Sequence, residues 1–137
     1  MSHVAVYAYG GSIVEYGLMP FCYYESSDTE SGRQHGTTLA VGDVVMYARK
    51  DNRGVGWDNA SSIDYARGVV ITADNNQYVV QKSGLLLCAR VGITEFQKGD
   101  YVGITNGKLA IVQSASDAVG RVIYVQGTKG FIEFNWR

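Results

Sequence analysis

Proline and cysteine are scarce in this chain. Its 137 residues include 1 Pro and 2 Cys, against 17 Gly. Two cysteines are too few for the disulfide framework on which small secreted domains depend. Cys22 and Cys88 both lie in apolar stretches, which favours reduced and buried thiols, with a disulfide as the alternative. The chain is long enough for one domain to fold around a core without such cross-links.

Histidine is equally scarce, which limits catalysis and metal binding. His3 and His35 have no cysteine or second histidine at zinc-site spacing, and neither has a setting typical of a general base. Asp51, Asp58 and Asp64 lack the alternating acidic pattern of a calcium loop. We therefore predict that the protein is not an enzyme and has no catalytic residue, metal site or cofactor.

The chain also lacks long apolar runs and an excess of either charge. No stretch approaches the roughly 18 consecutive apolar residues of a membrane span, and the first residues do not resemble a secretory signal. Lys and Arg total 12 and Asp and Glu 13, for a net charge of -1. A protein that binds nucleic acid or anionic lipid usually carries a basic surface. We expect a soluble protein that folds in a cytoplasm, without a nucleic-acid or membrane partner.

Glycine and tyrosine are abundant, and this composition indicates short strands separated by tight turns. The 10 Tyr and the many β-branched residues suit a pleated, half-buried surface. The best helical windows, residues 59–65 and 114–119, are short enough to be loops or single turns. The expected strands of the body are residues 43–49, 67–72, 77–81, 85–90, 101–105, 108–113, 120–126 and 131–136.

Several turn signals separate these strands. Asn106-Gly107 is the strongest, because a two-residue type I′ turn requires a positive φ at both positions. Asp74-Asn75-Asn76 and Gly127-Thr128-Lys129-Gly130 are further hairpin signals, and Asp51-Asn52-Arg53-Gly54 ends a strand. From this spacing we expect the last four strands to form a meander.

One pattern of turn and strand occurs twice in the chain. The first copy is Val41-Gly42-Asp43-Val44-Val45 and the second is Lys98-Gly99-Asp100-Tyr101-Val102. Each copy is followed by a strand that begins with glycine, at Gly68 and at Gly120. Residues 69–71 are apolar in succession, which indicates a strand covered on both faces.

These signals predict an all-β, single-domain fold with little or no helix. The architecture is either a small β barrel or a two-sheet sandwich, jelly-roll-like or β-tulip-like. We expect residues 1–24 to form an N-terminal arm or edge strands and residues 38–137 to form the body. Residues 25–37 contain no apolar side chain, which predicts a polar, mobile loop that either faces a partner or is merely flexible.

The aromatic residues are the best candidates for an interface, because tyrosine and tryptophan combine a large apolar surface with a polar tip. Five of the 10 tyrosines fall in residues 1–24, which could pair with another subunit or form ordinary edge strands. Trp57 lies in a glycine-rich stretch, residues 54–59, expected to be a loop that caps the core or anchors a partner. The candidate interface residues are Tyr7, Tyr9, Tyr16, Tyr23, Tyr24, Trp57 and Trp136.

Residues 41–134 show a spacing of turns and strands that resembles a known family. The residues concerned are Gly42-Asp43-Val44-Val45, Gly68-Val69-Val70, Gly99-Asp100-Tyr101-Val102, Asn106-Gly107-Lys108, Ala118-Val119-Gly120-Arg121-Val122 and a final strand that ends at Phe134. In these residues the chain resembles the decoration proteins of tailed bacteriophage heads, also called cement or head-stabilising proteins. It departs from them in its longer aromatic N-terminal quarter and in residues 25–37.

The resemblance implies a structural virion protein made in the host cytoplasm. Such a protein binds the capsid exterior as a trimer or dimer and cements neighbouring subunits of the major capsid protein. Two other functions are open for a chain of this composition. One is a receptor- or carbohydrate-binding module of a phage fibre or tail, with Trp57, Trp136 and tyrosines stacked on sugar rings. The other is a different structural component of the tail or neck.

Overall fold

The computed structural model describes residues 4–6, 21–90, 97–105, 107–126, 129–134 and 136, and for residues 4–6, 21–27, 87–90, 105, 126 and 129 it describes the backbone alone. It confirms a nearly all-β single domain, in which a closed five-stranded barrel carries further strands. Tyr7, Tyr9 and Tyr16 lie outside the described residues, and so do the side chains of Cys22 and Cys88. The elements are β1 (Val4–Val6), β2 (Phe21–Gln34), β3 (Val44–Asp51), β4 (Gly54–Asn59), β5 (Gly68–Asp74), β6 (Gln77–Arg90), β7 (Tyr101–Thr105), β8 (Lys108–Val112), the 3-10 helix η1 (Ala115–Asp117), β9 (Ala118–Gln126) and β10 (Lys129–Phe134).

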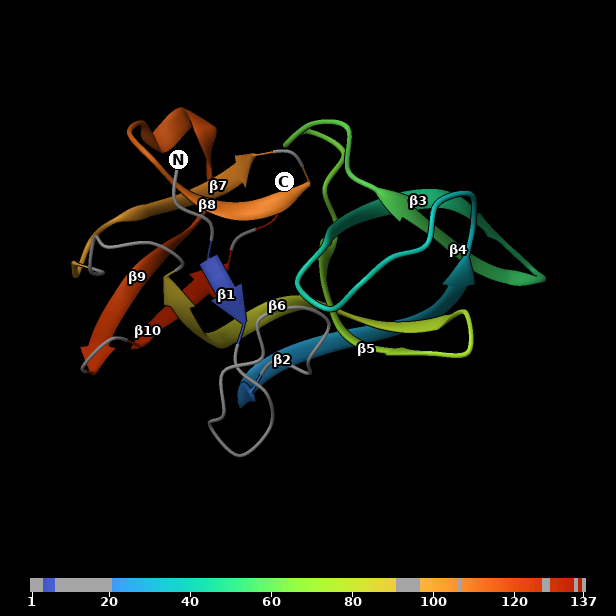
Figure 1. Cartoon of the computed structure of the whole chain (residues 1–137), viewed down its shortest axis with the longest axis horizontal. Helices are drawn as coiled ribbons and strands as arrows, with labels where there is room; N and C mark the ends of the chain where they lie inside the picture. The colour runs from blue at the N-terminus through green and yellow to red at the C-terminus, as the bar shows by residue number, and fades with distance from the viewer. Residues whose placement is uncertain are drawn as a thin grey trace.

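The strands form one continuous sheet that folds into two lobes (Figure 1). Its order is β2–β4–β3–β5–β6–β10–β9–β7–β8, and an additional pairing of β2 with β6 closes the barrel. The barrel is therefore made of β2, β4, β3, β5 and β6. The C-terminal strands continue from the second half of β6, which is also paired with β1.

The long strand β6 belongs to both lobes. The sequence pattern predicts two strands, at residues 77–81 and 85–90, whereas the structure has a single strand that passes through Gly84 at a φ of 99°. The buried side chain of Gln81 holds this passage, because its Nε2 donates to the carbonyls of Ser83 (3.1 Å) and Leu85 (3.0 Å). The amide thus satisfies two backbone acceptors at the irregular point of the strand.

The expected mobile loop at residues 25–37 is wrong, because most of it lies in β2. This strand pairs with β6 from Asp28 to Arg33 and runs parallel to β4 at Arg33 and Gln34. Its partly buried positions, Glu30, Gly32 and Gln34, alternate with exposed ones. The period of two was hidden because the inward residues are polar or lack a side chain, so the segment has no apolar pattern.

Residues 54–59 also form a strand rather than a loop. In β4, Trp57 points into the barrel and its ring stacks on Tyr47, with centroids 4.9 Å apart. The alternate positions, Gly54 and Gly56, carry no side chain, so the strand lacks the apolar signature that would have predicted it.

The expected meander of the last four strands is wrong as well. The chain forms the β7–β8 hairpin, but β9 then pairs with β7 and not with β8. Gly103 in β7 permits this crossing, because a Cβ there would collide with the carbonyl oxygen of Asp117 in η1. A three-residue helix, capped by the Ser114 hydroxyl, thus brings the chain across β7.

The turn predictions are confirmed. The β5–β6 hairpin turns at Asn75 and Asn76, with φ values of 46° and 64°, as a type I′ turn requires. Thr105 pairs with Lys108 across the β7–β8 turn, and the β9–β10 hairpin forms at its expected place. The strand β3 ends at Asp51 as expected, but the hairpin that it forms with β4 was not predicted.

The twofold pattern in the sequence is a structural repeat. The first unit has the strand order β4–β3–β5–β6, and the second has the corresponding order β8–β7–β9–β10. In the first, Gly42 N donates to Val70 O (2.9 Å) and Val70 N donates to Asp43 O (2.9 Å). In the second, Gly99 N donates to Val122 O (2.7 Å) and Val122 N to Asp100 O (2.9 Å).

The register of the two units also agrees. Val45 pairs with Gly68, and Val102 pairs with Gly120. The strands β5 and β9 each have an irregularity directly after the corresponding valine, at Ile71 after Val70 and at Ile123 after Val122. Each glycine lies against the next strand. A Cβ would collide with Gln81 O at Gly68, and at Gly120 it would lie 2.6 Å from Glu133 O.

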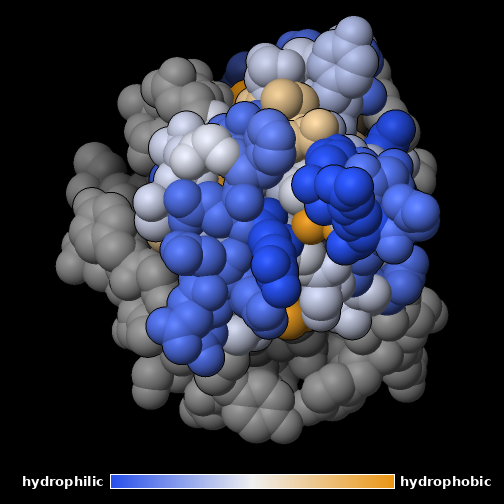
Figure 2. All heavy atoms as spheres, turned by 90° about the vertical axis from the view of Figure 1, so that its right-hand side faces the viewer, coloured by the Kyte–Doolittle hydropathy of each residue, from blue (hydrophilic) through white to orange (hydrophobic). Residues whose placement is uncertain are grey.

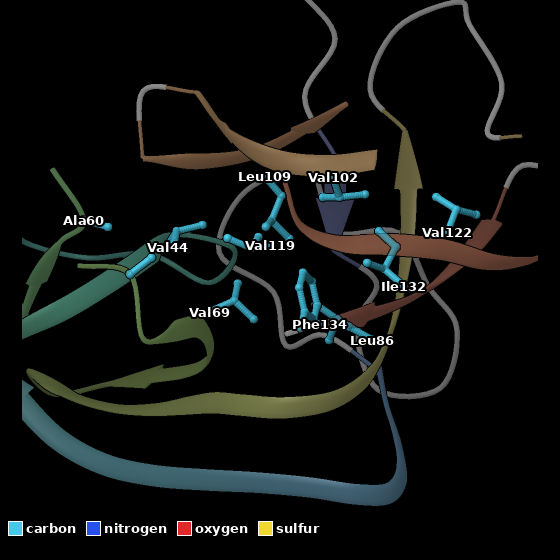
Figure 3. Close-up of a cluster of buried hydrophobic side chains, with 11 residues drawn as sticks. Val44, Ala60, Val69, Leu86, Val102, Leu109, Val119, Val122, Ile132 and Phe134 are labelled. Carbon is cyan, nitrogen blue, oxygen red and sulfur yellow. The ribbon is translucent and has the colours of Figure 1, made fainter. Parts of the chain in front are cut away.

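Two hydrophobic clusters stabilise these units. One fills the barrel and consists of Leu39, Val41, Val45, Trp57, Val70, Tyr78 and Val80. The other lies between the outside of the barrel and the C-terminal strands (Figure 3), and consists of Val44, Ala60, Ala66, Val69, Leu86, Val102, Leu109, Val119, Val122, Ile132 and Phe134. The expected covering of both faces of residues 69–71 is confirmed, since Val69 belongs to one cluster and Val70 to the other.

Candidate functional site

The tryptophans expected at an interface belong to the interior. Trp57 is completely buried, so it cannot anchor a partner and acts as part of the barrel core. Trp136 is half-buried and stacks on Phe134, with ring centroids 5.0 Å apart. Of the candidate tyrosines, Tyr23 and Tyr24 lie in β2, but their side chains are outside the described part of the chain. The structure thus removes Trp57 and Trp136 from the candidate surface, while the tyrosine positions stay a prediction.

The repeat reveals a different surface. In the first unit Val44, Val69 and Gln81 are adjacent on neighbouring strands and completely buried, and the two valines pack against the second unit. The corresponding row in the second unit is Tyr101, Arg121 and Glu133, which is partly or fully exposed. The same side of the repeat is thus covered in one unit and open in the other. We call this surface the open face: Lys98, Tyr101, Arg121, Ile123, Tyr124 and Glu133.

The open face is hollowed. A depression of about 750 Å³ lies over it, between the turn at residues 97–100 and η1. The guanidinium of Arg121 lies 5.0 Å from the centre of the Tyr101 ring, and its Nη2 donates to Gly99 O at 3.4 Å. These contacts hold a charged group over an aromatic ring at the rim of a concave surface.

One side of the open face is apolar. Ile123 is 38% exposed and Tyr124 is 57% exposed, which places both among the large apolar side chains most accessible in the described part of the chain. The Tyr124 ring packs at a tilt on Phe131, with centroids 5.7 Å apart. Tyrosine, arginine and exposed aliphatic residues around a concavity are the composition of a protein-binding surface.

A second polar cluster lies at one end of the barrel. Glu30 accepts a hydrogen bond from the Tyr47 hydroxyl and forms ion pairs with Lys50 (3.2 Å) and Lys82 (3.1 Å). Partial burial opposes ionisation, but the hydrogen bonds from Tyr47, Lys82 and Lys50 outweigh it and lower the pKa of Glu30. The hydrogen bond with Tyr47 and then that with Glu30 raise the pKa of Lys82. Both partners are thus held in their charged forms, which suits a structural network rather than proton transfer.

Other kinds of site are not apparent in the described ranges. Within them, no group of three or more His, Cys, Asp or Glu side chains could hold a metal ion. None of the helical segments described has the length and apolarity to span a bilayer. His35 is exposed at the end of β2, where its backbone N donates to Trp57 O at 3.1 Å.

No protein-family model, curated protein or solved structure matches the chain. The open face therefore stands on its geometry alone. Sequence reasoning missed Tyr101, Arg121 and Tyr124, although a signal was present. Comparing the two copies residue by residue shows Val44 and Val69 of the first replaced by Tyr101 and Arg121 in the second, which indicates that the second copy is not covered there.

Proposed function

We propose that this chain is a structural virion protein that binds the outside of a phage capsid and cements neighbouring major capsid subunits. The open face is the observation that supports this function. It presents Tyr124, Ile123 and Arg121 beside a depression, at a place where the first copy of the repeat makes a buried contact. A surface of this composition fits a partner protein better than a substrate.

The arrangement also suits the repeated contacts of a shell. Each copy on a symmetric shell needs only a modest interface, because oligomerisation multiplies weak contacts into high avidity. We therefore propose a dimer or trimer that engages assembled shells more strongly than free capsid subunits.

The test is co-sedimentation with purified shells from the same source, together with the molar mass by light scattering. The double variant Ile123→Ser and Tyr124→Ser should lower the affinity for shells by about tenfold or more, because central apolar anchors dominate binding energy. Tyr65→Ser is the matched control, since Tyr65 is 63% exposed but lies on the β4–β5 connection. The proposal would be contradicted if the double variant bound shells as tightly as the Tyr65→Ser control does. It would also be contradicted if the wild type bound free capsid subunits as tightly as assembled shells.

The carbohydrate-binding alternative in its original form loses support. It placed Trp57, Trp136 and tyrosines on sugar rings, but Trp57 is buried and Trp136 stacks on Phe134, which leaves only the tyrosines. A tail or neck component remains distinguishable in the same experiment, because it would sediment with isolated tails rather than with tail-free shells.

A further inference from the structure

A second concave surface lies on the barrel, away from the open face. It follows β4, whose outward positions Gly54 and Gly56 carry no side chain, between β2 and the end of β3. The hollow measures about 550 Å³, and its walls include Arg33, His35, Arg49 and Arg53. Figure 2 looks onto this side of the molecule and shows mainly hydrophilic residues around a depression. We call this surface the basic groove.

The glycine floor gives the basic groove its depth. Gly56 is itself buried, because the side chains of His35 and Arg49 close over it; a Cβ there would lie 3.2 Å from His35 Cβ and 3.4 Å from Arg49 Cβ. A Cβ at Gly54 would meet nothing within 4 Å, which leaves that end open to solvent. A ligand can therefore approach the backbone of β4 closely at Gly54, between basic walls.

The charge of the basic groove is only partly balanced. Arg49 uses its Nε in an ion pair with Asp51 at 3.3 Å, and Asp51 Oδ1 also accepts the backbone N–H of Arg53. Among the residues that the structure describes, the guanidinium groups of Arg33 and Arg53 have no hydrogen-bond or ion-pair partner. Guanidinium groups bind carboxylate, sulfate and phosphate in a bidentate manner, so the basic groove is suited to an anion.

The basic groove continues into a strip of amides. A neighbouring hollow of about 450 Å³ shares Arg33, Gln34 and Gln77 with it and adds Asn75 and Asn76 at the β5–β6 turn. Amide side chains both donate and accept hydrogen bonds, which suits the hydroxyl groups of a sugar chain. The amide of Gln34 already bonds the Tyr78 hydroxyl and Gly36 O, so Asn75, Asn76 and Gln77 are the amides suited to this role. The combined surface thus has anion-binding groups in one part and hydroxyl-binding groups in the adjoining part.

These features distinguish between kinds of anionic polymer. Single-stranded nucleic acid usually stacks its bases on Phe, Tyr or Trp side chains, and none of these lines either hollow in the described part of the chain, where His35 is the one aromatic ring. A peptide ligand usually needs apolar pockets for its side chains, whereas Val55 is the only large apolar residue lining the two hollows in that part. From this we infer that the basic groove binds an acidic polysaccharide, with Arg33, Arg49 and Arg53 on its anionic groups and the amides on its hydroxyls.

The test measures binding of the full chain to three soluble polysaccharides by titration calorimetry: polygalacturonate, dextran sulfate and neutral dextran. The first two distinguish carboxylate from sulfate recognition. We expect binding to at least one of them, weakened by added salt because exposed charges are screened, and no binding to neutral dextran. No binding to either anionic polymer, or equal binding to neutral dextran, would overturn the inference.

Matched variants locate the site. The double variant Arg33→Gln and Arg53→Gln removes two exposed charges without a described partner, and should lower the affinity by about tenfold or more, since each contact contributes a few-fold. The control Lys98→Gln and Arg121→Gln removes the same charge from the open face and should leave the affinity almost unchanged. The melting temperatures of both double variants, compared with that of the wild type, verify that they fold. An equal loss in both variants would show non-specific attraction and contradict the site.

Two further polymers test the class of ligand. Polyglutamate and oligothymidylate should bind more weakly than the preferred polysaccharide. Tighter binding of polyglutamate would show that the ligand is an acidic peptide, and tighter binding of oligothymidylate would show that it is a nucleic acid. The inference does not rest on the proposed capsid function. Shell co-sedimentation with the variant of Arg33 and Arg53 separates the two, because it should bind shells like the wild type.

Discussion

Asp43 and Asp100 occupy the same position in the two copies of one turn. Asp43 Oδ2 accepts the backbone N–H of Ala40 at 2.8 Å, and Asp100 Oδ2 accepts that of Gln97 at 2.9 Å. Among the described residues, only Asp43 has a further partner, the ammonium group of Lys108 at the start of β8. Asp100 thus stabilises its own turn, whereas Asp43 stabilises its turn and also joins the two units of the repeat.

This difference predicts unequal effects of the same substitution. Asp43→Asn keeps an acceptor for the turn but removes the charge that faces Lys108, and should lower the free energy of unfolding by about 1 to 2 kcal/mol, because Asp43 is largely buried. Asp100→Asn should cost at most about 0.5 kcal/mol. Urea unfolding followed by circular dichroism measures both. Equal losses would show that the ion pair with Lys108 contributes nothing.

Gln81 and Glu133 are another corresponding pair with opposite surroundings. Gln81 is buried and bonded to the backbone of β6, whereas Glu133 is exposed on the open face. Gln81→Glu places a carboxylate against carbonyl oxygens in the interior and should destabilise the fold by about 3 kcal/mol or more. Glu133→Gln should change stability by less than about 0.5 kcal/mol. Melting temperatures at neutral pH decide the matter, and a mild effect of Gln81→Glu would argue against the burial of this residue.

Gly32 lies directly over the indole of Trp57. A Cβ at this position would collide with Trp57 Nε1 and lie 2.8 Å from Val55 O. Gly32→Ala should therefore cost about 1 to 3 kcal/mol and alter tryptophan emission, because the barrel must shift to admit the methyl group. The neighbouring exposed change Ser31→Ala is the control. Unchanged emission and stability in Gly32→Ala would contradict the packing of β2 on β4.

The cluster around Glu30 predicts a dependence of stability on acid. The native pKa of Glu30 is lower than its ordinary value of about 4.3, so its contribution is fully present above that pH and is lost as the pH falls through the native pKa. Glu30→Gln should cost about 1 kcal/mol at pH 7, and this difference from the wild type should shrink toward zero in acid. Unfolding at pH 7, 4 and 2.5 tests it, and a constant difference would exclude the linkage.

Local chemistry accounts for the parts of the fold that could be predicted. The Asn75-Asn76 turn, the hairpin at Gly107 and the glycines at positive φ in both Gly-Asp turns follow from short-range backbone preferences. The strands rich in valine follow from their apolar period. The strands β2 and β4 could not be recognised this way, because Glu30 and Gln34 are satisfied by residues distant in sequence, and Gly54 and Gly56 have no side chain to signal a face.

The candidate surface was missed for a related reason, although the exchange of Val44 and Val69 for Tyr101 and Arg121 between the two copies was a signal. Exposure is not a property of the residue type, and Trp57 and Tyr124 show opposite outcomes for two aromatic residues in strands. The amino-acid sequence by itself determined the all-β class, the turns and the repeated unit, because these depend on neighbours within a few positions. Only the tertiary structure decided which copy of the repeat is covered, where β2 closes the barrel and which aromatics reach the surface, because these depend on long-range strand pairing that local patterns do not specify.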